Sequence, residues 1–97
     1  YIQDLIIGVE NILKYESSKN ETFNITFGSE RKIMDMAKIV QKNFPKITIN
    51  TKKRDKLMPI RGTLSVDKAK KLINYNPKWS LEKGYPEYIN WYKNFIK

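Results

Sequence analysis

The stretch SVDKAKKLINYNPKWSLEKGYPEYINWY, residues 65–92, predicts a short helix, a turn and a second helix. In its first part, apolar side chains recur at helical spacing, at Val66, Ala69, Leu72 and Ile73. Pro77 marks the turn that follows. Pro86 lacks an amide hydrogen, so we expect it to be the first residue of the second helix, after a turn at 81–85.

The aromatic side chains of this stretch are predicted to fill a core. The second helix repeats apolar residues at helical spacing, at Tyr88, Ile89, Tyr92, Phe95 and Ile96. Large rings at helical and turn positions usually fill space between elements. A stacking surface for a base or a sugar is the alternative for Tyr75, Trp79, Tyr88, Trp91 and Tyr92.

Upstream of this stretch, the pattern predicts helices and strands in turn. Apolar spacing indicates an amphipathic helix over 1–16 and another from Ile33 to Phe44, which stops before Pro45. The segments TFNITF at 22–27 and KITINTKK at 46–53 are typical of short strands, and 54–64 of a loop. The predicted fold is therefore α+β, with about four helices and two or three short strands in one small domain, residues 1–97.

The amino-acid composition limits the kinds of site that the chain can form. The 97 residues contain no cysteine and no histidine, so disulfides, cysteine metal sites and a histidine general base are excluded. The net charge of +9 lies entirely in residues 46–97, with thirteen basic and four acidic side chains. This half favours a polyanion or a phosphorylated ligand, and a lysine-rich surface without a partner is the alternative.

The sequence gives no sign of a membrane protein. No apolar run approaches the roughly 20 residues that span a bilayer, and no signal peptide opens the chain. We therefore expect a cytoplasmic protein. Because the first residue is Tyr1 rather than methionine, we also expect the chain to come from a longer protein.

Four segments in order resemble the extended short-chain dehydrogenase/reductases, the NAD-dependent epimerases and dehydratases that act on nucleotide sugars. SVDKA at 65–69, NYNPKWSLEKG at 74–84 and the pair Trp91-Tyr92 resemble the family's closing pattern. YIQDL at 1–5 is similar to the family's Y-V-D-D-L, with Gln3 in place of the first aspartate. FNITFGS at 23–29 is similar to F-N-I-G-S-G, with a displaced glycine, and the helix after it matches the family's in place and period.

The resemblance implies a two-part enzyme of which this chain is the C-terminal, substrate-binding part. NAD(P) would be bound by a Rossmann domain that this chain lacks, and the full-length enzyme would be a homodimer. Tyr15 and Lys19 repeat the family's Y-x-x-x-K spacing. They follow the YIQDL segment, however, whereas the family's pair precedes it, so no catalytic residue is assigned here. The fragment alone is expected to be inactive.

The resemblance places a nucleotide-diphosphate sugar against the basic segment TKKRDKLMPIRGTL, residues 51–64. The family carries an R-x-x-D segment whose arginine often contacts the diphosphate, and guanidinium groups suit phosphate oxygens. Here Asp55 takes the aspartate position, Lys52 takes the arginine position and Arg54 lies two residues away. Arg61, followed by Gly62, is a second candidate for the phosphate contact. The alternative is a solvated charged loop.

Two other functions fit the sequence less well. The run KKRDK at 52–56 and the interleaved aromatic residues would suit a small nucleic-acid-binding module, but no known reader motif accompanies them. A non-catalytic structural domain is the other alternative.

Overall fold

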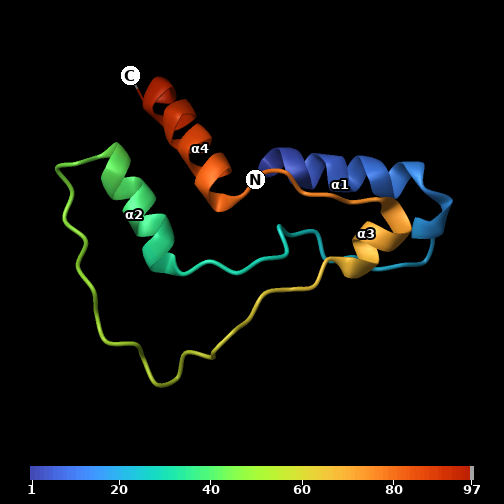
Figure 1. Cartoon of the computed structure of the whole chain (residues 1–97), viewed down its shortest axis with the longest axis horizontal. Coiled ribbons are helices and arrows are strands. Elements are labelled where there is room, and N and C mark those ends of the chain that lie inside the picture. The colour runs from blue at the N-terminus through green and yellow to red at the C-terminus, as the bar shows by residue number, and fades with distance from the viewer. Residues whose placement is uncertain (97) are drawn as a thin grey trace.

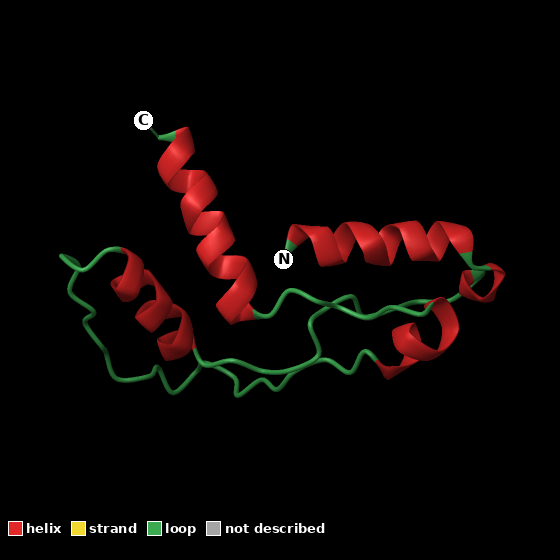
Figure 2. Ribbon diagram, turned by 45° about the horizontal axis from the view of Figure 1, so that its top comes forward, coloured by secondary structure: helices red, strands yellow, loops and turns green. Residues whose placement is uncertain are grey.

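The computed structural model describes residues 1–96 and forms helices joined by extended chain (Figure 1). The elements are α1 (Ile2–Lys14), the short 3-10 helix η1 (Glu16–Ser18), α2 (Ile33–Asn43), α3 (Asp67–Ile73) and α4 (Leu81–Phe95). They lie in two groups, because α1 and η1 pack with α3, whereas α2 packs with α4. Figure 2 shows extended chain running between the two groups.

The chain is flat and open. It extends over 50 × 40 × 17 Å, and its radius of gyration is 16.9 Å. A compact domain of this length would have a radius of gyration of about 12–13 Å. The apolar stripe that predicts α1 is accordingly exposed along much of its length, at Ile2, Leu5, Ile6, Val9 and Leu13. Within residues 1–96, this stripe is only partly covered.

The core lies around α3. Four buried residues form it: Val66, Ala69, Ile73 and Tyr75. Partly buried side chains pack against them from the end of α1, from the segment after η1 and from α3 itself, namely Ile12, Tyr15, Phe23, Ile25 and Leu72. The Tyr75 hydroxyl donates a hydrogen bond of 3.0 Å to the Thr26 carbonyl. Burial, together with the charge of Asp4, raises the pKa of Tyr75, so this donor stays protonated.

Two left-handed residues shape the chain around this core. Asn74 ends α3 with a φ of 51°, a conformation that asparagine tolerates better than most residues. Gly28 has a φ of 82°, and a Cβ atom there would lie 2.8 Å from Val66 Cγ2. Glycine at position 28 therefore permits both the turn and the close approach to the core.

The α+β prediction is wrong, because residues 1–96 contain no strand. The segments 22–27 and 46–53 have the composition of strands, but a strand exists only where a neighbour completes its hydrogen-bond ladder. Phe23 and Ile25 pack on the core from an extended segment, and Ile47 is exposed. Composition therefore predicted two strands that these residues do not form, because no partner strand pairs with them.

The predicted start of the last helix is also wrong. Helix α4 begins at Leu81, and the Ser80 carbonyl accepts the amide hydrogens of Lys83 and Gly84. Pro86 therefore lies inside the helix rather than at its first position. The missing amide would have bonded the Glu82 carbonyl, and one lost bond near the helix start leaves the later turns intact.

An ion pair ties the chain before α2 to the first turn of α4. Arg31 Nε lies 2.7 Å from Glu82 Oε1, and both side chains are partly exposed. The hydrogen bond from Arg31 is the main reason why the pKa of Glu82 falls from 4.5 to about 2. Within the group formed by α2 and α4, the start of α2 is thus held to α4 partly by a charge pair that acid can break.

This pair predicts a pH-dependent contribution to stability. Because the folded-state pKa of Glu82 is depressed, its contribution is present above the unfolded value of about 4.5 and is lost as the pH falls toward about 2. We expect Glu82→Gln to lower the urea midpoint at pH 6 and to leave it unchanged near pH 2. Glu87→Gln, on an exposed position of the same helix, is the control. An equal difference between wild type and Glu82→Gln at both pH values would contradict the assignment.

Candidate functional site

The candidate site is the basic loop, defined here as residues 46–64, which joins α2 to α3. It carries six basic side chains and one acidic one, a net charge of +5. In Figure 1 this part of the chain, coloured green to yellow, lies apart from the helices. All four residues that the sequence assigned to substrate binding lie on it and are exposed: Lys52, Arg54, Asp55 and Arg61.

A tight turn stands in the middle of the basic loop. The Met58 amide donates to the Asp55 carbonyl at 3.2 Å, and the Leu57 amide donates to Asp55 Oδ1 at 2.9 Å. Arg54 Nη2 donates to the Pro59 carbonyl at 2.7 Å and makes a longer contact of 3.4 Å with the Met58 carbonyl. Asp55 and Arg54 therefore bond to the loop's own backbone.

Lys52 and Arg61 differ from these two residues. Within the described residues, neither side chain makes a hydrogen bond or an ion pair. They flank the turn on its two sides, and Gly62 beside Arg61 has open space around its Cα. Their charges are therefore available to an anionic ligand.

The two ends of the basic loop are fixed to different groups of helices. At its start, Lys93 of α4 donates to the Asn43 carbonyl at 3.0 Å and lies over the Phe44 ring. At its end, Asn24 donates to the Ser65 carbonyl at 3.2 Å, and Val66 is buried. The sequence predicts a loop here from Pro59 and Gly62, but it does not indicate these attachments.

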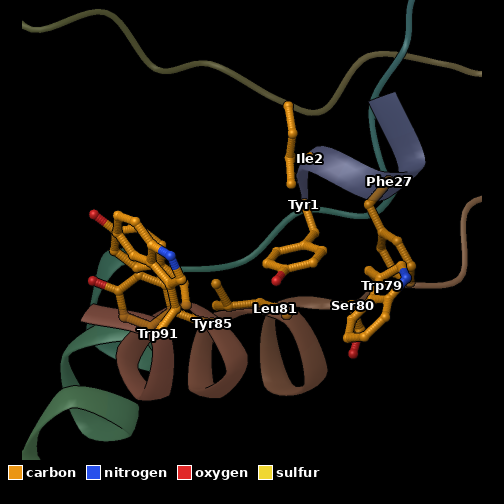
Figure 3. Close-up of a pocket in the computed structure, with 10 residues that line it drawn as sticks. Tyr1, Ile2, Phe27, Trp79, Ser80, Leu81, Tyr85 and Trp91 are labelled. Atoms are coloured by element: carbon orange, nitrogen blue, oxygen red, sulfur yellow. The ribbon is translucent and has the colours of Figure 1, made fainter. Parts of the chain in front are cut away.

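A second feature, absent from the sequence-based site, is an aromatic groove beside the start of α4. Its volume is about 650 Å³, and it is lined mainly by rings, those of Tyr1, Phe27, Trp79, Tyr85, Tyr88 and Trp91. Figure 3 shows Tyr1 between Phe27 and Trp79 at one end and Tyr85 and Trp91 at the other. The rings of Tyr1 and Trp79 lie 4.7 Å apart, and Lys83 Nζ lies 4.3 Å from the Trp79 ring.

The aromatic residues of α4 form a ladder along one face of the helix. Neighbouring rings stack from Tyr85 to Tyr88, Trp91 and Phe95, with centroids 5.1–6.2 Å apart. The prediction that the aromatic residues fill a core holds for Tyr75, which is 1% exposed. It is wrong for Tyr88, Trp91 and Tyr92, which are 45–55% exposed. Helical spacing places them on one face, but it cannot show whether another element covers that face.

Other kinds of site find no support in residues 1–96. No group of three acidic, cysteine or histidine side chains comes together to hold a metal ion there. None of the described helices has both the length and the apolar character needed to cross a bilayer.

Comparison with known proteins gives two distant relatives. No family model and no solved structure matches the chain. An uncharacterized protein of Methanocaldococcus jannaschii is 26% identical over 98 residues, covering 95% of this chain and 28% of that protein. UDP-glucuronic acid decarboxylase 1 of Arabidopsis thaliana is 28% identical over 97 residues, covering 99% of this chain and 22% of that enzyme.

These matches run through the whole chain, including the basic loop, but the chain spans only about a quarter of the length of the relatives it matches. The name of the plant relative describes an enzyme whose substrate is a nucleotide sugar. The distant similarity agrees with the resemblance to nucleotide-sugar epimerases and dehydratases.

Proposed function

We propose that this chain is the nucleotide-sugar-binding portion of an NAD-dependent sugar-nucleotide epimerase or dehydratase. One observation carries the proposal: the segment that is similar to a UDP-glucuronic acid decarboxylase contains a loop of net charge +5 that stands clear of the helices. A nucleoside diphosphate carries concentrated negative charge, and such a loop attracts it. In this proposal the basic loop contacts the diphosphate of the substrate.

Within the basic loop, Arg61 is the best candidate for a direct phosphate contact. Its guanidinium presents a planar fork that matches two phosphate oxygens. It is exposed and has no partner among the described residues. Lys52 adds a second cation on the other side of the turn, as a point charge rather than a fork.

The described residues do not fit NAD. The pyrophosphate of a dinucleotide needs a glycine-rich turn between a strand and a helix. The four glycines here lie far apart, at 8, 28, 62 and 84, and residues 1–96 contain no strand. In this proposal NAD is therefore held by another part of a longer protein, and no step of the reaction is assigned to this chain.

The proposal predicts that Arg61→Ala weakens UDP binding. Loss of a charge-assisted hydrogen-bonded contact costs about 1.5–3 kcal/mol, so we expect roughly a 10- to 100-fold rise in Kd. The measurement is calorimetric titration of the complete protein with UDP and, separately, dTDP. Lys42→Ala is the control, because it removes one exposed positive charge outside the loop.

Two outcomes would contradict the proposal. The first is an unchanged Kd for both nucleotides in Arg61→Ala. The second is tight binding of single-stranded RNA that falls steeply as salt rises, without binding of UDP, since that behaviour would identify a nucleic-acid-binding module.

A further inference from the structure

Arg54 and Arg61 lie seven residues apart on the same loop, and their guanidinium groups have different surroundings. Arg54 Nη2 is 2.7 Å from the Pro59 carbonyl and 3.4 Å from the Met58 carbonyl. Arg61 makes no such contact within the described residues. Because Arg54 hydrogen-bonds two carbonyls of its own loop, it stabilises the conformation of that loop.

The guanidinium nitrogen that makes these contacts determines whether Arg54 can also bind an oxyanion. A guanidinium binds an oxyanion through two N–H groups that point the same way, either Nε with Nη2 or Nη1 with Nη2. Arg31 shows the first arrangement, since its Nε and Nη2 lie 2.7 Å and 3.4 Å from the two oxygens of Glu82. Both arrangements need Nη2, and in Arg54 this nitrogen faces two carbonyls.

The turn that Arg54 closes leads directly to Arg61. The Pro59 carbonyl, which accepts the shorter bond, stands two residues before Arg61. Proline fixes its own φ near −65°, so an anchored Pro59 limits the directions in which the next residues leave the turn. The Asp55 hydrogen bonds to Leu57 and Met58 hold the other side of the same turn.

We infer that Arg54 is a positioning residue, which closes the turn at 54–59 and thereby presents Arg61 to the diphosphate. This inference rests on the proposed function, because it deepens the role of the same loop. Arg54 acts on the ligand through Arg61 and does not contact phosphate itself.

A double-mutant cycle on UDP affinity in the complete protein tests the inference. We expect Arg54→Ala to raise the Kd for UDP roughly three- to ten-fold when Arg61 is present, and less than about two-fold when Arg61 is already alanine. If Arg54 contacted phosphate itself, the fold-losses of the two single variants would instead multiply in the double variant, which would overturn the inference. Lys42→Ala, which removes one exposed positive charge outside the basic loop, is the control and should change the Kd less than two-fold.

A second measurement examines the turn without any ligand. We expect the Leu57 and Met58 amides to exchange hydrogen faster in Arg54→Ala than in wild type, and at the wild-type rate in Arg61→Ala. Equal exchange rates in Arg54→Ala and wild type would overturn the inference. If no single variant changes UDP affinity, the proposed function fails instead, and the exchange rates still decide whether Arg54 closes the turn.

Discussion

Replacing Ile73 by alanine is expected to destabilise the chain by roughly 2–5 kcal/mol, the usual cost of a cavity at a buried aliphatic residue. Ile73 is 0% exposed and belongs to the cluster that holds α3 against α1. Because small domains have a net stability of only about 5–15 kcal/mol, such a loss removes a large part of it. The urea midpoint of the chain, followed by circular dichroism, measures the effect.

The matched control is Ile33→Ala, the same substitution at a residue that is 82% exposed at the start of α2. We expect its free energy of unfolding to stay within about 0.5 kcal/mol of wild type, since exposed positions rarely contribute more. Equal losses at the two positions would show that the core does not lie around α3. A loss at Ile33 alone would show that α2 packs differently.

Three of the four helices could be predicted from the sequence, because their apolar residues repeat at helical spacing. The predicted helix over 1–16 agrees with α1, and the one ending at Phe44 agrees with α2 to within one residue. The short helix predicted from the stripe Val66 to Ile73 agrees with α3. Spacing along one segment is local information, and it fixes which residues share a face.

What the sequence could not predict depends on contacts between distant segments. The rings of Tyr88 and Trp91 share a helical face as expected, but whether that face is covered depends on other elements. The strand composition at 22–27 likewise indicates extended chain, and a ladder needs a second strand. Both errors come from assuming that a pattern suited to burial or pairing finds its partner within this chain.

At the candidate site, too, the sequence predicted local features but not the contacts that each side chain makes. Turn residues predicted a loop at 54–64, which contains Arg54, Asp55 and Arg61, whereas Lys52 fell in the predicted strand at 46–53. All four assigned residues are exposed on the basic loop. The sequence offered Arg54, beside Lys52 at the family's arginine position, and Arg61 as a second candidate for phosphate, and it did not distinguish their roles. Their difference rests on the carbonyls of Met58 and Pro59, whose positions follow from turn geometry rather than from residue type.

The last prediction concerns Asp4, a carboxylate that is 4% exposed although it lies on a largely exposed helix. Its two oxygens accept the amide hydrogens of Lys78 and Trp79, at 2.9 Å and 2.8 Å. These amides belong to the segment that connects α3 to α4. Asp4 therefore joins α1 to the connection between the two groups of helices.

Asp4→Ala is expected to cost roughly 2–4 kcal/mol, because it leaves two partly buried amides without an acceptor. Asp4→Asn should cost less, since an amide oxygen can still accept one of the two bonds. Hydrogen exchange at the Lys78 and Trp79 amides, together with the urea midpoint, measures both effects. Glu10→Gln on the same helix controls for the change of charge, because Glu10 is exposed.

Unchanged exchange at Lys78 and Trp79 in Asp4→Ala would mean that α1 does not hold this connection. Faster exchange would show that the Asp4 carboxylate holds the connection between α3 and α4.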